Sequence, residues 1–73
     1  MPHDLNGLKV ERGDFVKAQL YTGKTIGVVG AISEGSETCN LTVHYLAPGQ
    51  VMCSTVTAKE CEIMMRADGS EPA

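Results

Sequence analysis

The chain has 73 residues, of which 6 are Lys or Arg and 9 are Asp or Glu, so its formal net charge is -3. This length suits one small domain and excludes a second folding unit. The negative charge makes nucleic acid a less favoured partner, and no apolar run approaches the roughly 20 residues of a membrane-spanning helix, so no membrane contact is expected.

Both ends of the chain have the composition of loose tails. Residues 1–7 and 67–73 show no apolar periodicity and are rich in Gly, Pro and polar side chains, so we expect flexible tails on either side of an ordered domain at 8–66. The first segment also lacks the basic and apolar regions of an export signal. Together with an odd number of cysteines, three in all, these features predict a cytoplasmic protein with free thiols.

The first predicted strand covers residues 15–21, where apolar and polar side chains alternate. Alternation along a strand directs successive side chains to opposite faces of a sheet. One face holds Val16, Ala18 and Leu20, and the other holds Phe15, Lys17, Gln19 and Tyr21. A turn is expected at 22–24, around Gly23.

A second strand is predicted at 25–32, and it is apolar on both faces. Ile26, Val28 and Ile32 fall on one face, and Val29 and Ala31 fall on the other. Gly27 and Gly30 fit a strand that bends sharply, because a side chain at the bend would collide with the neighbouring strand. A polar loop follows at 33–37. The remaining predicted elements are a strand at 39–45, a turn at 47–50, a strand at 51–56, a single 3-10 turn at 57–60 and a last strand at 61–66.

Five short strands without helical periodicity predict an all-β domain, and closure into a barrel would remove its exposed edges. The segments Glu11-Arg12-Gly13-Asp14-Phe15-Val16 and Gly27-Val28-Val29-Gly30-Ala31-Ile32 resemble the first hairpin of SH3-like barrels of the KOW and Tudor kind. The segment 56–63 resembles the 3-10 turn and last strand of the same architecture. The resemblance implies a five-stranded SH3-like barrel with a short 3-10 turn before the last strand.

A second resemblance concerns the turn at 47–50. Pro48-Gly49-Gln50-Val51 is similar to the turn before the active-site strand of the plasmid-borne type II dihydrofolate reductases, a family of tetrameric SH3-like barrels. That strand carries Val-Gln-Ile-Tyr in the family and Val51-Met52-Cys53-Ser54 here, so the folate-binding Gln and the Tyr are missing. No catalytic residue is carried over. The resemblance implies only that such a barrel can assemble into an oligomer.

The Cys and His residues do not predict a metal centre or a catalytic site. No Cys-x-x-Cys pair occurs, and Cys39 and His44 lie five residues apart on one predicted strand, which directs them to opposite faces. A nucleophilic Cys–His pair could draw only on His44 or on His3 in the first tail. The three cysteines are expected to pack in or near the core as small apolar residues. We therefore expect no metal, no cofactor and no catalytic residue.

An apolar patch on the outside of the first two strands suggests an interaction surface. Phe15 and Tyr21 lie on the outer face of the first strand, and Val29 and Ala31 of the second strand are assigned to the same patch. A monomer rarely leaves a large apolar patch uncovered, although a tail or the long loop could cover it. The leading hypothesis is a non-enzymatic interaction module that forms homo-oligomers through these four residues and binds a protein partner. Self-association would also stabilise so small a domain.

The sequence is also compatible with two other functions. A cluster of basic residues in the first third of the chain could contact RNA phosphates in the manner of KOW-type barrels, although neighbouring acidic residues offset much of its charge. These basic residues are Lys9, Arg12, Lys17 and Lys24. An enzyme formed by a pore between identical subunits, like the type II reductases, is the third hypothesis and has the least support.

Overall fold

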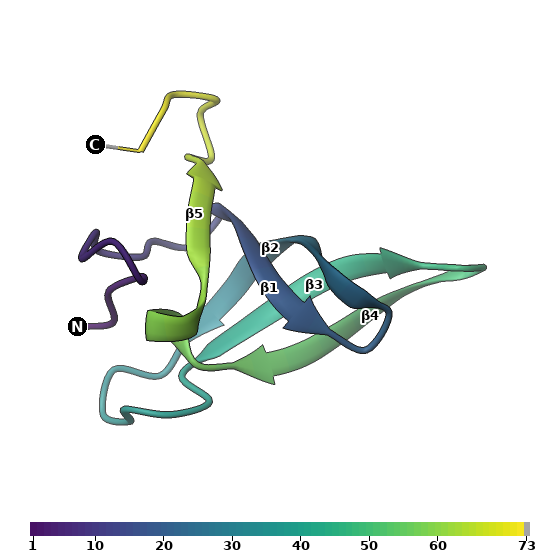
Figure 1. The fold of residues 1–73 in the computed structure, drawn as a ribbon, viewed down its shortest axis with the longest axis horizontal. Coiled ribbons are helices and arrows are strands. Elements are labelled where there is room, and N and C mark those ends of the chain that lie inside the picture. The colour runs from purple at the N-terminus through teal and green to yellow at the C-terminus, as the bar shows by residue number, and fades with distance from the viewer. Residues whose placement is uncertain (73) are drawn as a thin grey trace.

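The computed structural model describes residues 1–72, in which five antiparallel strands form one sheet (Figure 1). The elements in chain order are β1 (Phe15–Leu20), β2 (Gly23–Ile32), β3 (Leu41–Ala47), β4 (Gln50–Val56), the 3-10 turn η1 (Ala58–Glu60) and β5 (Glu62–Met65). The strand order across the sheet is β4-β3-β2-β1-β5, so β4 and β5 form its two edges. The predicted all-β class is confirmed. Within residues 1–72 the sheet is not closed by pairing between β4 and β5, so the barrel stays a prediction.

The turn between β1 and β2 decides which residues of the two strands share a face. The turn contains only Tyr21 and Thr22, and it pairs Leu20 with Gly23 and Phe15 with Val28. The three-residue turn expected at 22–24 would have set Phe15 on the same face as Val29. Because side chains alternate along a strand, a change of one residue in the turn exchanges the two faces of β2.

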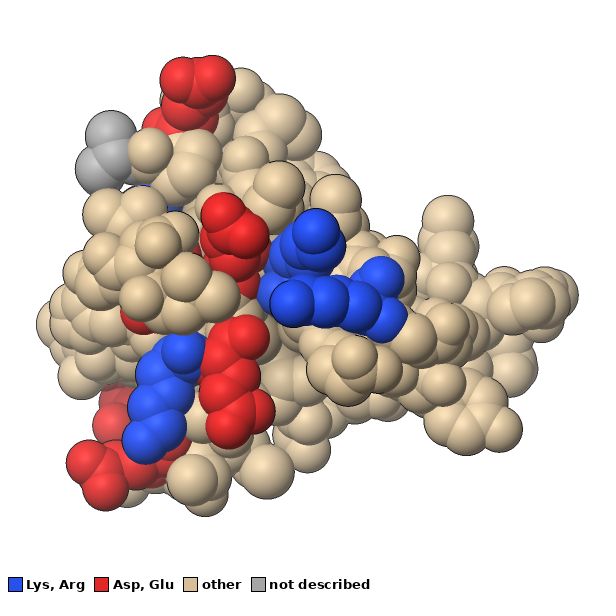
Figure 2. Space-filling model, in the orientation of Figure 1, with Lys and Arg blue, Asp and Glu red and all other residues tan. Residues whose placement is uncertain are grey.

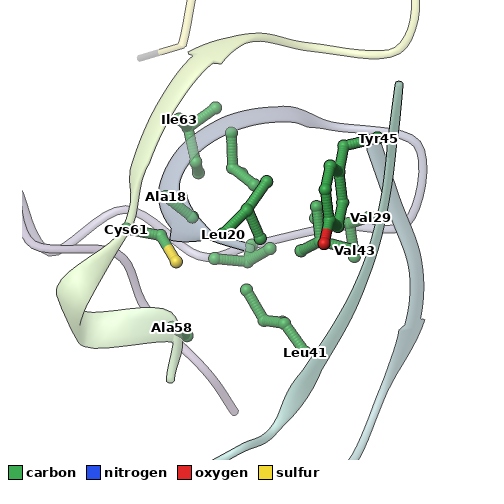
Figure 3. Close-up of a cluster of buried hydrophobic side chains, with 11 residues drawn as sticks. Ala18, Leu20, Val29, Leu41, Val43, Tyr45, Ala58, Cys61 and Ile63 are labelled. Atoms are coloured by element: carbon green, nitrogen blue, oxygen red, sulfur yellow. The ribbon is translucent and has the colours of Figure 1, made fainter. Parts of the chain in front are cut away.

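This shorter turn corrects the position predicted for Val29. Val29 is 1% exposed and pairs with Val43 of β3, so it belongs to the core and not to an outer patch. Figure 3 shows its side chain among the other buried apolar residues of the strands and η1. The core consists of Val10, Val16, Ala18, Leu20, Val29, Leu41, Val43, Tyr45, Ala58, Cys61 and Ile63.

Two glycines of β2 lie where a side chain would collide with the neighbouring strand, as the sequence predicts. A Cβ atom at Gly27 would collide with the side chain of Val43 and the carbonyl oxygen of His44. At Gly30 it would collide with the imidazole ring of His44, and the pairing between β2 and β3 shifts by one residue at this point. A bulge of this kind bends a strand and re-aims the residues beyond it. Ala31 consequently stays on the outer face, where it pairs with Thr42.

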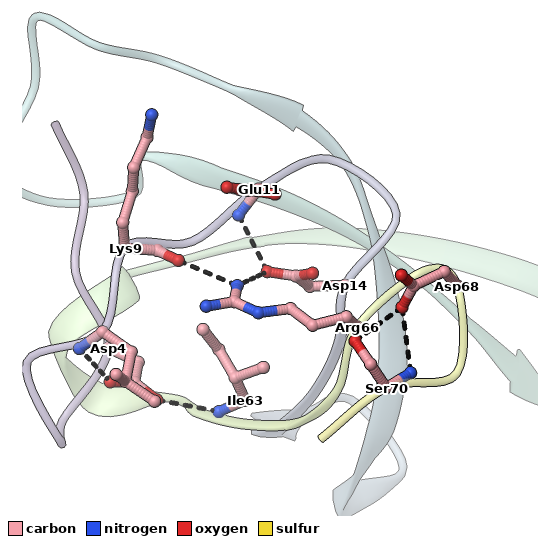
Figure 4. A network of polar contacts seen from close by, with 9 residues as sticks. Asp4, Lys9, Glu11, Asp14, Ile63, Arg66, Asp68 and Ser70 are labelled. Carbon is pink, nitrogen blue, oxygen red and sulfur yellow. Dashed lines mark hydrogen bonds and ion pairs between the residues drawn. The ribbon is translucent and has the colours of Figure 1, made fainter. Parts of the chain in front are cut away.

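Residues 1–14 pack along the free side of β5 through contacts that the sequence analysis did not anticipate. The buried carboxylate of Asp4 accepts hydrogen bonds through Oδ1 from the N–H groups of Asn6 and Leu8. Through Oδ2 it accepts the N–H of Ile63 in β5 at 3.0 Å (Figure 4). The N–H of Leu5 donates to the carbonyl oxygen of Cys61 at 2.9 Å. The first segment therefore satisfies backbone groups of β5 that a bare edge strand would expose.

A buried ion pair joins the end of the sheet to the segment before β1. The guanidinium of Arg66 donates from Nη1 to Asp14 Oδ2 at 2.6 Å and to the carbonyl oxygen of Lys9 at 2.9 Å. The same carboxylate accepts the N–H of Glu11 at 2.8 Å (Figure 4). Asp14 is fully buried, so this hydrogen bonding is what makes its charge tolerable inside the domain.

Among residues 1–72, no helix has the length and apolar character needed to cross a membrane.

Candidate interaction surface

An apolar surface lies on the face of the sheet that points away from the core. In an antiparallel sheet, residues directly opposite each other on neighbouring strands lie on the same face. One row of such residues runs across four strands, with Phe15 paired to Val28, Val28 to His44 and His44 to Cys53. Ile26, Leu46 and Val51 lie beside this row, and all three line the same shallow hollow of about 330 Å³ as Phe15 and Val28.

The apolar side chains around this hollow are unusually accessible to solvent. Leu46 is 79% exposed, Val51 is 65% exposed and Ile26 is 49% exposed. Leu46 and Val51 are directly paired across β3 and β4, so they form one continuous apolar surface. Isolated exposed apolar residues are common, whereas a contiguous group of them marks a surface that another molecule covers.

Charged residues are absent from the part of this surface that lies on β3 and β4. Residues 38–58 contain no Asp, Glu, Lys or Arg, although the whole chain has 15 such residues. This stretch includes all of β3 and β4, which form a hairpin that projects from the rest of the molecule (Figure 1). Figure 2 shows acidic and basic side chains mixed over the body of the domain and only uncharged residues on the visible side of the projecting hairpin. A second copy could therefore approach the hairpin with little charge repulsion.

The structure does not bring the four residues predicted for the interface together. Phe15 is half-buried and lines the apolar hollow, but Val29 lies in the core. Tyr21 is 83% exposed in the turn that follows β1, at the opposite end of that strand from Phe15. Ala31 is exposed on the outer face beyond the bulge of β2. Of the predicted set, only Phe15 lines the observed apolar hollow.

The basic residues considered for RNA contact come from different parts of the domain. Lys17 and Lys24 lie on the outer face of the β1–β2 hairpin, where they are paired with Ile26 and Gln19 respectively. Lys9 and Arg12 belong to the segment that precedes β1, and both are exposed. Figure 2 shows Lys and Arg side chains side by side near the centre of this view, with Asp and Glu side chains close beside them. Such mixing weakens the field that a phosphate backbone would meet.

The three cysteines have different environments, and only one lies in the core as predicted. Cys61 is buried, and burial, followed by the nearby charges of Glu60 and Asp4, raises the pKa of its thiol to about 11. Cys53 is exposed on the outer face of β4. Cys39 is exposed and precedes β3 with a φ of 49°, a left-handed conformation that Asn adopts more readily than Cys. Within residues 1–72, no three His, Cys, Asp or Glu side chains are grouped so that they could hold a metal ion.

Sequence reasoning missed Ile26, Leu46 and Val51, the most exposed apolar residues of the surface. The alternation of β3 places Leu46 on the face opposite Val43 and Tyr45, so its exposure follows from the same pattern that identifies the core. The absence of charged residues at 38–58 is a second signal that the sequence carries. Together, the two signals point to the outer face of the β3–β4 hairpin.

No protein-family model, no curated protein and no solved structure matches this chain.

Proposed function

We propose that this protein is a non-enzymatic interaction module that self-associates, and that its contact surface is the β3–β4 hairpin with the adjoining outer face of β2. In this proposal the domain is a cytoplasmic SH3-like barrel that forms a homo-oligomer and presents its charged surface to a protein partner. The observation that carries the proposal is the exposure of Leu46 and Val51 within a stretch of 21 residues, 38–58, that has no charged side chain.

Two physical arguments support self-association. A net charge of -3 makes copies of the chain repel one another at long range, so copies meet most readily where charged side chains are absent. Burial of apolar area in the contact contributes about 25 cal/mol per Å², and Leu46 and Val51 of the hairpin are the most exposed large aliphatic side chains of the sheet. Association of folded copies also shifts the folding equilibrium toward the native state, which benefits a domain with a small core.

Sedimentation velocity of the full chain over a range of micromolar concentrations tests the proposal. We expect an oligomer for the natural chain and a monomer for the double variant Leu46→Ser, Val51→Ser. Tyr21→Ser is the matched control, because Tyr21 is as exposed as Leu46 but lies outside the hairpin, and this variant should still associate. A natural chain that stays monomeric, or a double variant that associates as well as the natural chain, would refute the proposal.

A further inference from the structure

The two edges of the sheet differ in whether their backbone is covered. The outer side of β5 meets residues 1–14, through the hydrogen bond of Ile63 N–H to Asp4 and that of Leu5 N–H to the carbonyl oxygen of Cys61. The outer side of β4 has no strand paired to it in residues 1–72, and β1 approaches β4 without pairing with it. Hydrogen-bonding groups of the β4 backbone are therefore free to pair with another strand.

The sequence of β4 lacks the features that usually protect an edge strand. Natural edge strands are guarded by charged side chains, by Pro, by bulges or by very short length. β4 has seven residues, Gln-Val-Met-Cys-Ser-Thr-Val, and contains neither a charged residue nor Pro nor Gly. Its pairing with β3 runs through all seven residues without a shift of register, so the strand is also free of bulges. An edge of this kind is a template for strand addition.

The geometry points to a second copy of this chain as the occupant of the β4 edge. We propose that β4 of one copy pairs antiparallel with β4 of another across a two-fold axis, which joins the two sheets into one. This inference rests on the proposed self-association and specifies how the copies meet. The hairpin is the uncharged part of a chain of net charge -3, so a second hairpin is a partner that meets no like charge there.

The register of this pairing follows from the length of β4. Cys53 is the central residue of Gln50–Val56, so the pairing that overlaps the whole strand sets Cys53 opposite Cys53 of the other copy. In the same register, Val51 lies opposite Thr55, and both belong to the outer face. Gln50 lies opposite Val56, beside a hollow of about 350 Å³ that is lined by Thr55, Val56 and residues of β1. This hollow leaves room at the end of β4 that lies nearest to β1.

Cysteine cross-linking tests this register directly. Residues opposite each other in an antiparallel pair have Cα atoms about 4.5–5.5 Å apart, within the range that a disulfide bridges. The test uses the full chain with Cys39→Asn, which removes the other exposed thiol, while Cys61 remains buried. Diamide takes two electrons and two protons from the two Cys53 thiols, an S–S bond forms, and diamide is reduced to the hydrazine. We expect a covalent dimer on a non-reducing gel, and none when Cys53→Ser is added.

A second measurement does not depend on the thiols. Amide hydrogen exchange of β4 should slow when the protein concentration is raised into the range where the oligomer forms, whereas exchange of β5 should not change. Cys53→Lys places two like charges opposite each other on the axis and should abolish the dimer. Met64→Lys is the matched control, because Met64 of β5 is also exposed but lies outside both β4 and the proposed contact surface, and this variant should leave the dimer intact.

The outcomes separate this inference from the proposed function. Cross-linking through Cys53 with slower exchange in β4 supports both. An oligomer that neither cross-links through Cys53 nor protects β4 overturns the edge pairing and leaves self-association standing. A monomer at all concentrations overturns both proposals, and protection of β4 only on addition of another protein overturns the choice of a second copy as the occupant.

Discussion

The β5 edge and the β4 edge of the sheet both have a side without a partner strand, but only the β5 edge is covered by another part of the chain. The β5 edge is covered within the chain, by Asp4 and by the Arg66–Asp14 ion pair, and every buried side-chain N or O atom among residues 1–72 has a hydrogen-bond partner. The β4 edge has no such cover among residues 1–72, and β4 itself contains no charged residue. Substitutions near β5 should therefore act on folding, whereas substitutions on β4 should act on association.

The largest effect on stability is expected when the ion pair between Asp14 and Arg66 is broken. Asp14→Ala removes the acceptor of the Arg66 guanidinium and of the Glu11 N–H, and leaves a partly buried positive charge without its partner. We expect the free energy of unfolding to fall by about 3 kcal/mol, as is typical when one member of a buried ion pair is removed. Urea denaturation followed by circular dichroism, at a concentration where the protein is monomeric, measures this change.

A second substitution identifies the source of that loss. Arg66→Met added to Asp14→Ala removes the unpaired charge, so the double variant should be more stable than Asp14→Ala alone. If the two losses simply added, the ion pair would not be what holds the segment before β1 against the end of β5.

The second prediction concerns Cys61, next to β5, and the way its thiol makes the stability of the domain depend on pH. Burial raises the pKa of Cys61 from 9.0 to about 11, so the unfolded chain loses this proton at lower pH than the folded chain does. The contribution of the protonated Cys61 thiol to the free energy of unfolding is therefore complete below pH 9. It is lost as the pH rises toward 11, by an amount on the order of 2 kcal/mol. Denaturation measured across this range should show a steeper loss for the natural chain than for Cys61→Ala, which has no thiol to ionise.

Reactivity gives a control within the same molecule. Cys53 is exposed on β4, so at neutral pH it should react with a thiol reagent much faster than Cys61. Equal rates for these two thiols would contradict the different environments of the two edges.

The sequence predicted the strands and the core better than it predicted the faces and the edges. Alternation identifies Val16, Leu41 and Tyr45 as core residues because the period of two is local. The faces of β2 depend on the turn at Tyr21 and Thr22, where a difference of one residue moves Val29 from the surface to the core. The contact of Asp4 with Ile63 joins residues 59 positions apart, and no local pattern indicates such a partner. Long-range polar contacts were therefore beyond sequence reasoning.

The third prediction concerns a substitution that breaks the hydrogen bond between Asp4 and β5 but keeps the hydrogen bonds of Asp4 within the first segment. Asp4→Asn retains an oxygen for the N–H groups of Asn6 and Leu8, but it sets an amide NH₂ against the N–H of Ile63. We expect a loss of about 1–2 kcal/mol, because a buried donor is left without an acceptor. Hydrogen exchange of the Ile63 amide should become faster. Asp68→Asn is the control, since Asp68 is exposed and its carboxylate accepts hydrogen bonds from Ser70, and unchanged exchange at Ile63 in Asp4→Asn would contradict the prediction.

The smallest effect on stability is expected for a substitution on the β4 edge. Val51→Thr replaces an exposed side chain with one of similar shape, so the free energy of unfolding of the monomer should change by less than about 0.5 kcal/mol. The same replacement at the buried Val10, in the segment that covers β5, puts a hydroxyl in the core and should cost about 1–3 kcal/mol. Both values come from urea denaturation at low concentration. A large loss for Val51→Thr in the monomer would mean that β4 is held by the fold of its own chain, and a strand so held would not be free to pair with a second copy.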